Sequence, residues 1–230
     1  YGQTGPKRDV AGHDLNYIGD TGLLALSMGP VSAPVVPPAL IADIAGGTYP
    51  AVLNILLALA ERQRTGRGRA LDIAMTDNLF TFMYWGIGNG LGAGAWPGNG
   101  TDLVTGGPPR CRLYPTRDGR VVAAAPIEDR FWAIFCDLIG LDAALRDDGK
   151  DTAATTRRIA AIIGAETSDF WRGRFMGHDC CCSIVATLEE AMADPHFKAR
   201  GLFQYTLRNE AGRTMPALPV PIIPAFRADP

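Results

Sequence analysis

Residues 46–66 read Gly-Gly-Thr-Tyr-Pro-Ala-Val-Leu-Asn-Ile-Leu-Leu-Ala-Leu-Ala-Glu-Arg-Gln-Arg-Thr-Gly. Leucine, alanine and isoleucine dominate this stretch after Tyr49, whereas glutamate and arginine gather at its far end. Gly66 provides a stop, because glycine readily adopts the left-handed conformation that ends many helices. The stretch therefore predicts a long, largely buried helix over residues 49–64, and the rest of the chain can be placed around it.

The segment before this helix is stiff and leads to an acidic residue. Residues 29–38 contain four prolines among small residues, a composition that stiffens a loop and excludes helix. This loop delivers Asp43, in Ile-Ala-Asp-Ile-Ala-Gly-Gly, to its place. Gly46 and Gly47 follow at the expected helix start, where free N–H groups can face an anion and glycine lets a ligand approach the backbone. We therefore predict that both glycines contribute to substrate binding.

The segments after the helix predict a strand, a second helix and a connection. Residues 69–75 alternate in part between apolar and polar or small side chains, as in a short strand. A helical pattern covers residues 76–85. The glycine-rich residues 86–107 show no apolar period and many backbone breakers, which predicts a flexible connection or active-site loop and a domain boundary.

A hairpin and several helices are predicted beyond this boundary. Residues 110–115 and 120–125 flank Asp118-Gly119, a pair of residues typical of hairpin turns. Apolar residues spaced by three and four, followed by a glycine, predict an amphipathic helix over residues 130–140. Further helical patterns cover residues 155–163, 168–176 and 187–193, a turn or short helix covers 196–200, and the proline-rich residues 215–230 look extended.

Composition excludes some classes of partner. A chain of 230 residues with 47% hydrophobic and 20% charged residues is long enough to bury a good core. The formal net charge is −2, and no block of lysine and arginine marks a surface for nucleic acid or an anionic membrane. The longest apolar stretch, residues 51–60, is shorter than the ~20 residues that a spanning helix needs, so no membrane span is predicted.

The cysteines predict free thiols. They are Cys111, Cys136 and the consecutive run Cys180, Cys181 and Cys182. No Cys-x-x-Cys spacing indicates a zinc site, adjacent cysteines are poor disulfide partners, and an odd total does not suggest a secreted framework. We therefore expect a reducing compartment, with the cytoplasm as the default, and no bound metal.

Three ionisable residues stand out: His13 in Ala-Gly-His-Asp, Asp43, and Glu128 in Pro-Ile-Glu-Asp-Arg-Phe-Trp, separated by 30 and 85 residues. Taken singly, each has an ordinary interpretation as a polar loop residue, a turn or cap residue, or the start of a helix. Their order, spacing and surroundings are what give them a joint meaning.

These motifs resemble the α-methylacyl-CoA racemases of the family III CoA-transferase (CaiB/BaiF) superfamily. The resemblance extends over nearly the whole chain: Tyr-Gly-Gln-Thr-Gly-Pro at 1–6, Glu-Arg-Gln-Arg-Thr-Gly-Arg-Gly-Arg at 61–69, Gly-Gly-Pro-Pro-Arg-Cys-Arg-Leu-Tyr-Pro-Thr-Arg-Asp-Gly at 106–119 and Asp-Pro-His-Phe-Lys-Ala-Arg-Gly at 194–201. It implies an α/β fold with a large Rossmann-like domain, a small α/β domain and two subunits interlocked as a homodimer.

The same comparison assigns residues to domains. Residues 1–105 would be the remainder of the large domain with its glycine-rich linker, residues 106–205 the small α/β domain, and residues 206–230 a return segment that packs on the large domain. Because the chain starts with Tyr1 in the middle of a loop motif, we expect an amino-terminal portion of the large domain, including part of the coenzyme A site, to be missing.

The resemblance also implies a reaction and roles. Inverting the 2-position of a branched acyl-CoA needs a base on one face of the carbon and an acid on the other, and His13 and Asp43 form that pair. The ordinary pKa of a histidine is already near neutral pH, so it needs little change for this role. The pKa of an aspartic acid must be raised, for example by burial, before it can hold a proton at that pH. Glu128 would orient His13, and the backbone N–H of Asp14 would stabilise the enolate. Coenzyme A enters as part of the substrate, and no separate cofactor is expected.

Two alternatives remain open at this stage. A family III CoA-transferase would use Asp43 as a nucleophile that accepts the acyl group as a mixed anhydride. A non-catalytic subunit that binds acyl-CoA or a partner chain is the other, although retention of Asp43 argues against it. Ala42 stands where a glycine commonly precedes the aspartate, and no motif defines the acyl chain that is accepted.

Overall fold

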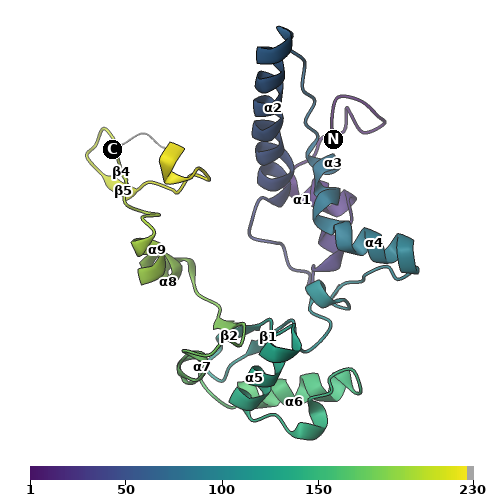
Figure 1. Ribbon diagram of the computed structural model, residues 1–230, viewed down its shortest axis with the longest axis vertical. Coiled ribbons are helices and arrows are strands. Elements are labelled where there is room, and N and C mark those ends of the chain that lie inside the picture. The colour runs from purple at the N-terminus through teal and green to yellow at the C-terminus, as the bar shows by residue number, and fades with distance from the viewer. Residues whose placement is uncertain (227–230) are drawn as a thin grey trace.

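The structure, a computed structural model, describes residues 1–226, which form three regions (Figure 1). The amino-terminal region, residues 1–105, contains α1 (Asp14–Asp20), η1 (Leu24–Leu26), the π-helix η2 (Ile41–Thr48), α2 (Tyr49–Thr65), α3 (Met75–Leu79), η3 (Phe80–Met83), α4 (Tyr84–Ala93) and η4 (Leu103–Thr105). The central region, residues 106–186, contains β1 (Arg112–Pro115), β2 (Val121–Ala124), α5 (Asp129–Ile139), η5 (Ala143–Leu145), α6 (Thr152–Gly164), α7 (Ser168–Phe175) and β3 (Cys182–Ile184). The carboxy-terminal region, residues 187–226, contains α8 (Leu188–Ala193), α9 (Pro195–Ala199), β4 (Thr206–Arg208), β5 (Thr214–Pro216) and η6 (Pro224–Phe226).

The central region is a small antiparallel sheet covered by helices. Its strand order is β1-β2-β3, with Leu113 opposite Ala123 and Ala123 opposite Ser183. The predicted hairpin is confirmed, because β1 and β2 pair antiparallel with Pro115 opposite Val121. Gly119 in the turn between them takes a positive φ of 77°. The predicted helix over residues 130–140 is also confirmed as α5, which ends at Gly140.

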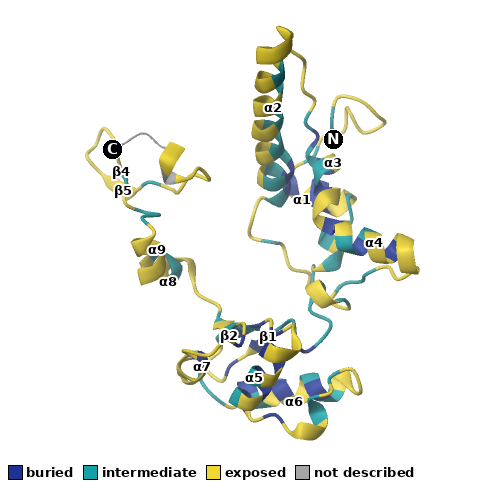
Figure 2. Ribbon diagram, viewed as in Figure 1, coloured by how far each residue is buried: buried dark blue, intermediate teal, exposed yellow. Residues whose placement is uncertain are grey.

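Aromatic and aliphatic side chains from every layer form the core of the central region. Phe135 and Cys136 of α5 are fully buried, as are Ile159 and Ile163 of α6. The core also contains Tyr114, Val122, Ala124, Trp132, Ile139, Leu141, Trp171, Phe175 and Cys180. The ring of Trp171 stacks on that of Phe175 with centroids 5.6 Å apart. Figure 2 shows dark blue segments in α5 and α6 of this region, and others near α1 and α4.

The amino-terminal region has a much smaller core. Tyr17 and Ile18 of α1, Ala42 of η2 and Leu79 of α3 pack together. Gly46 allows the close approach of η2 to α3, because a Cβ at this position would lie 2.7 Å from the carbonyl oxygen of Met75.

The long helix α2 corrects one prediction from sequence. Its extent is as expected, but none of its residues is buried, and Leu53, Leu56 and Leu57 are each at least 58% exposed. Figure 2 shows the helix in the colours of exposed and intermediate residues along its length. The sequence predicts burial because it is rich in leucine, yet the described chain leaves most of the helix surface exposed.

The helical run formed by η2 and α2 bears on the membrane prediction. Residues Ile41–Thr65 are long and apolar enough to cross a membrane, with a mean hydropathy of 1.4 over their most apolar window. Only 11% of that window is buried. One such helix is weak evidence for a membrane span, so the absence of a span stays a prediction.

The predicted strand over residues 69–75 is wrong within the described part of the chain. Residues 67–74 run as an irregular connection, and the described residues before Arg112 contain no strand. A strand needs a neighbouring strand for its backbone hydrogen bonds, and none lies beside this segment. The Rossmann-like sheet implied by the resemblance is therefore not formed by the residues that the structure describes.

The glycine-rich segment also differs from expectation, because α4 extends into it as far as Ala93. Gly86 and Gly90 lie on the side of α4 that meets Pro97 and Trp96. A Cβ at Gly90 would stand 2.4 Å from the Trp96 ring, so glycine is what lets the returning chain pack on this helix. The connection between regions is correspondingly shorter than the sequence predicts.

The carboxy-terminal region extends away from the central one. Thr187 and Glu190 form a capping box at the start of α8, and Arg120 of the central region donates hydrogen bonds of 2.9 and 2.7 Å to the two carboxylate oxygens of Glu190. All residues of β4 and β5 are exposed, and Figure 1 shows this hairpin apart from α1–α4. Packing of the return segment on the large domain stays a prediction, and residues 227–230 lie outside the described part.

Candidate active site

His13 immediately precedes α1. Its backbone is extended, with φ of −125° and ψ of 177°, and its N–H donates a hydrogen bond of 3.1 Å to Oδ1 of Asn16. This bond fixes the start of α1 and places His13 at its amino end. The residue is exposed, so its imidazole is accessible to a substrate or to another polypeptide.

Asp14 joins the two predicted acid/base residues. It is 8% exposed, and its Oδ1 accepts a hydrogen bond of 3.0 Å from the backbone N–H of Asp43. This bond ties the start of α1 to the first turn of η2, so the segments that carry His13 and Asp43 lie side by side. As the first residue of α1, Asp14 also has a backbone N–H without an acceptor in the helix, as the predicted enolate contact requires.

Asp43 lies in a π-helix, which the sequence does not predict. Its carbonyl accepts a 3.0 Å hydrogen bond from Oγ1 of Thr48, and the N–H of Tyr49 bonds to the carbonyl of Ile44, five residues back. Short π-helical turns are rare and frequently occur at functional sites. Asp43 is half-buried, and the apolar loop before it is largely exposed, so its surroundings within the described residues are more open than the sequence suggests.

Gly46 and Gly47 do not occupy the start of a helix, which corrects the reason for assigning them to substrate. The helical run begins at Ile41, so both glycines lie inside it. Their tight contacts are with α3: a Cβ at Gly47 would be 3.0 Å from Cγ of Met75, and the carbonyl of Gly46 accepts a 2.8 Å hydrogen bond from Asn78. The structure gives them a packing role, while substrate contact stays a prediction.

Glu128 stands apart from the other predicted residues. It precedes α5 in the central region and is exposed. Within residues 1–226 its side chain has no hydrogen bond or ion pair, and Figure 1 shows α5 and α1 in different regions. The described chain therefore brings the segments of His13, Asp14 and Asp43 together and leaves Glu128 elsewhere.

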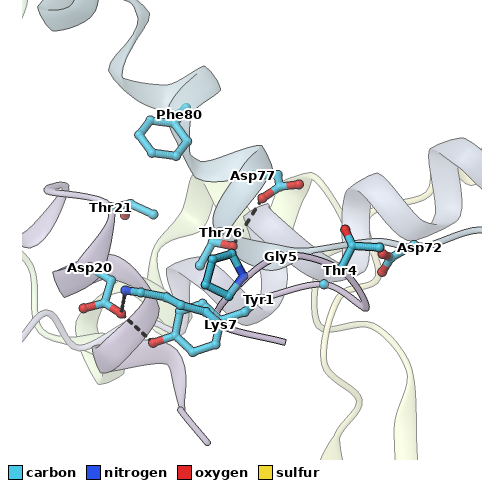
Figure 3. A pocket seen from close by; sticks show the side chains of 12 residues that line it. Tyr1, Thr4, Gly5, Lys7, Asp20, Thr21, Asp72, Thr76, Asp77 and Phe80 are labelled. Carbon is cyan, nitrogen blue, oxygen red and sulfur yellow. Dashed lines mark hydrogen bonds and ion pairs between the residues drawn. The ribbon is translucent and has the colours of Figure 1, made fainter. Parts of the chain in front are cut away.

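A cavity of about 350 Å³ lies beside α1 and α3, and its residues were missed from sequence (Figure 3). Oδ2 of Asp20 accepts hydrogen bonds of 2.6 Å from both Nζ of Lys7 and the hydroxyl of Tyr1. The bond from Lys7 is the main cause of the lowered pKa of Asp20, and the bond to Asp20 raises the pKa of Tyr1 to about 12. The only sequence feature that could have pointed to this cavity is the family-like motif at residues 1–6, which contributes Tyr1 to its lining. The cavity borders neither His13 nor Asp43.

The five cysteines are free thiols. Burial raises the pKa of Cys136 to about 11, and burial is also the main cause of the raised pKa of Cys182. A raised pKa keeps a thiol protonated and unreactive. No group of His, Cys, Asp and Glu among the described residues could hold a metal ion.

Comparison with known proteins places the chain in a family. Residues 1–227 match CoA-transferase family III. The human α-methylacyl-CoA racemase is 31% identical over 100% of this chain and 62% of its own length. The succinate–glutarate CoA-transferase of Agrobacterium fabrum is 30% identical over 97% of this chain and 57% of its own. The chain belongs to CoA-transferase family III.

A solved structure shows the same mixed α/β fold. The crystal structure of a CAIB/BAIF family protein from Brucella suis superposes with a TM-score of 0.75 at 24% identity, covering 98% of this chain and 60% of that one. The chain thus spans about three-fifths of the length of these relatives.

Proposed function

We propose that the protein racemises 2-methylacyl-CoA thioesters by moving a proton at the carbon beside the thioester. The observation that carries this proposal is the hydrogen bond between the Asp14 carboxylate and the Asp43 backbone, which holds the segments of His13 and Asp43 together. Similarity to the human α-methylacyl-CoA racemase over the whole chain supports the class of substrate.

The reaction assigns one step to each group. In one direction the His13 imidazole removes the proton from C-2, leaving an enolate, and the Asp43 carboxyl group returns a proton to the opposite face. In the other direction the two roles exchange. A single base could not serve both faces, so two groups from different segments meet a geometric requirement of inversion.

The enolate needs a hydrogen-bond donor at its oxygen, because stabilising the developing charge is commonly the largest catalytic effect. The backbone N–H of Asp14 is the proposed donor. It stands next to His13 in sequence, and the buried Asp14 carboxylate is already engaged with Asp43, which holds this N–H in place.

A second copy of the chain completes the site in this proposal. Glu128 would support His13, yet it lies in another region of the same chain. The exposed apolar side chains of α2 supply a surface suited to association. We propose a homodimer in which Glu128 of one subunit reaches His13 of the other. We also propose that the protein lies in the cytoplasm, because five free thiols are typical of a reducing compartment.

CoA transfer is the second candidate, and the similarity to the succinate–glutarate CoA-transferase favours it. Here Asp43 attacks the thioester carbonyl, CoA leaves as a thiolate, and the resulting mixed anhydride is passed to another acid. Asp43 is only half-buried and could reach a carbonyl as well as a C–H bond.

Deuterated water separates the two reactions. A single enantiomer of a 2-methylacyl-CoA is incubated with the protein, and label at C-2 and inversion are followed together. We expect both in the wild type and neither in His13→Ala or Asp43→Ala, whereas His178→Ala and Asp147→Ala, which alter exposed residues of the central region, retain them. Normal turnover in either site variant would refute the proposal. Acyl exchange without label, with an acyl-enzyme trapped by hydroxylamine, would favour CoA transfer.

Mixed subunits test the dimer. If each site combines two chains, His13→Ala and Glu128→Ala proteins that are inactive alone should regain activity when mixed and reassembled, because one hybrid site then has both His13 and Glu128. Mixing two preparations of His13→Ala is the matched control. Failure to regain activity, despite hybrid formation seen by native mass spectrometry, would show that the site lies within one chain.

A further inference from the structure

Arg110 sits at the centre of an interaction network beside Glu128. Its guanidinium donates 3.1 Å and 2.6 Å hydrogen bonds from Nη1 to the carbonyl of Ile127 and to Oδ1 of Asp129. These two partners are the residues immediately before and after Glu128. One side chain therefore binds the backbone carbonyl before the proposed supporting carboxylate and the side chain of the residue after it.

The guanidinium is itself held firmly. Nε donates a 2.9 Å hydrogen bond to Oδ1 of Asp148, and Nη2 lies 2.8 Å from the same atom. The Arg110 and Asp148 side chains are 19% and 15% exposed, so this ion pair is shielded from solvent on both sides. Such a pair is harder to break than an exposed one, and the planar fork of arginine fixes directions that lysine would not.

Trp132 links the network to the first turn of α5. The Arg110 guanidinium lies 4.8 Å from the centre of its ring. The backbone N–H of Trp132 donates a 2.9 Å hydrogen bond to the carbonyl of Glu128, and its ring N–H donates a 2.7 Å bond to the carbonyl of Arg146. The buried ring therefore forms a rigid wall against which Arg110 and the start of α5 are both placed.

We infer that Arg110 is the positioning residue of Glu128: by binding Ile127 and Asp129 it fixes the segment from which the exposed carboxylate reaches the imidazole that it supports. The inference rests on the proposed function, since it gives Arg110 an effect on catalysis only through Glu128. The Glu128 side chain has no hydrogen bond or ion pair of its own among the described residues, so its placement depends on the backbone that Arg110 anchors at Ile127. Misplacement of a catalytic group by about 1 Å can cost up to about 100-fold in rate.

The test is a double-mutant cycle in the intact protein with Arg110→Gln and Glu128→Gln. We expect Arg110→Gln to lower kcat for racemisation by about 10-fold or more with little change in KM. In the direction in which His13 takes the proton, the acid limb of kcat/KM should move to lower pH, because a less well placed carboxylate stabilises the imidazolium less. The same shift is expected in Glu128→Gln.

The double variant separates positioning from stability. If Arg110 acts through Glu128, adding Arg110→Gln to Glu128→Gln should cost no further activity. Arg146→Gln is the control, because Arg146 also binds a carboxylate, at 2.6 Å, and a backbone carbonyl of the same region. It should lower the melting temperature without moving the pH profile. Arg110→Lys, which keeps the charge but not the fork, should recover only part of the activity.

The outcomes distinguish the inference from the function on which it rests. The positioning role would be overturned if Arg110→Gln lowered kcat equally in the wild type and in Glu128→Gln. It would also be overturned if kcat fell while the acid limb of the kcat/KM profile stayed in place. Either result would leave the racemase proposal intact. An unchanged pH profile in Glu128→Gln itself would remove the role of Glu128 and the inference with it. If the His13, Asp43 and Glu128 variants all still take up label at C-2, the proposed function is refuted.

Discussion

The central and amino-terminal regions differ in how they are held together. Thirteen buried residues form one core in the central region, whereas the core of the amino-terminal region comprises four. The central region buries its helices against its own sheet. The amino-terminal region carries the proposed acid/base pair and leaves its longest helix without a buried residue. The proposed catalytic segments therefore belong to the part that depends more on surfaces outside itself.

Removing a large core side chain from the central region should have the largest effect. Phe135 is fully buried, so Phe135→Ala should lower the free energy of unfolding by about 3–5 kcal/mol. Phe170→Ala, at a position that is 47% exposed, should cost much less. Urea unfolding followed by tryptophan fluorescence measures both, and similar losses at the two positions would contradict a distinct core here.

A substitution on the exposed face of α2 should weaken association between subunits and change the stability of the fold little. Leu56 is 59% exposed, so Leu56→Lys should disturb the described chain little. If a second copy covers this residue, losing about 1.5–3 kcal/mol of burial should weaken dimerisation by about 10-fold to 100-fold. Sedimentation equilibrium measures this, with Gln63→Lys on the same helix as the control. Unchanged dimerisation would show that Leu56 lies outside the interface.

The contact between η2 and α3 should be sensitive to one methyl group. Gly46→Ala would place a Cβ 2.7 Å from the Met75 carbonyl oxygen and should cost about 1–3 kcal/mol. Gly88→Ala is the matched control in α4, where a Cβ meets nothing within 4 Å, and it should stabilise the helix by about 0.5–1 kcal/mol. Thermal unfolding compares them. A neutral Gly46→Ala would mean that this small core can expand freely.

The smallest effect concerns the ion pair between Arg120 and Glu190. The hydrogen bond from Arg120, followed by that from the Thr187 backbone, lowers the pKa of Glu190 to about 2. A lowered folded-state pKa means that the stabilisation is present above pH ~4.5 and is lost as pH falls toward about 2. In Arg120→Gln the carboxylate should titrate closer to its ordinary value, as NMR of the side-chain carbonyl would show. Arg117→Gln on the same hairpin should leave it unchanged.

Sequence predicted those elements that depend on local chemistry. The turn at Asp118-Gly119 and the glycine that ends α5 are recognisable without knowledge of the surroundings, and both are confirmed. The strand over residues 69–75 and the burial of α2 required partners that the described chain does not supply. Local pattern cannot reveal whether a suitable partner exists, because that depends on tertiary structure.

The candidate site divides in the same way. Spacing and family resemblance pointed to His13 and Asp43, and the structure joins their segments through Asp14. The carboxylate of Asp14 was not predicted to make this bond, since only its backbone N–H had been considered. The π-helix at Asp43 was also missed, because no residue type distinguishes a π turn from an α turn.

Because of the π-helix η2, the direction of the Asp43 side chain depends on the exact number of residues in that segment. Each of its turns holds more residues than an α turn spanning a similar distance, so deleting one residue, for example Ala45, would allow the segment to continue as an α-helix into α2. A residue in an α-helix advances by about 100°, so such a deletion would swing Asp43 around the helix axis while composition stayed nearly constant. The deletion of a single residue in η2 would then change the direction in which the Asp43 carboxylate faces.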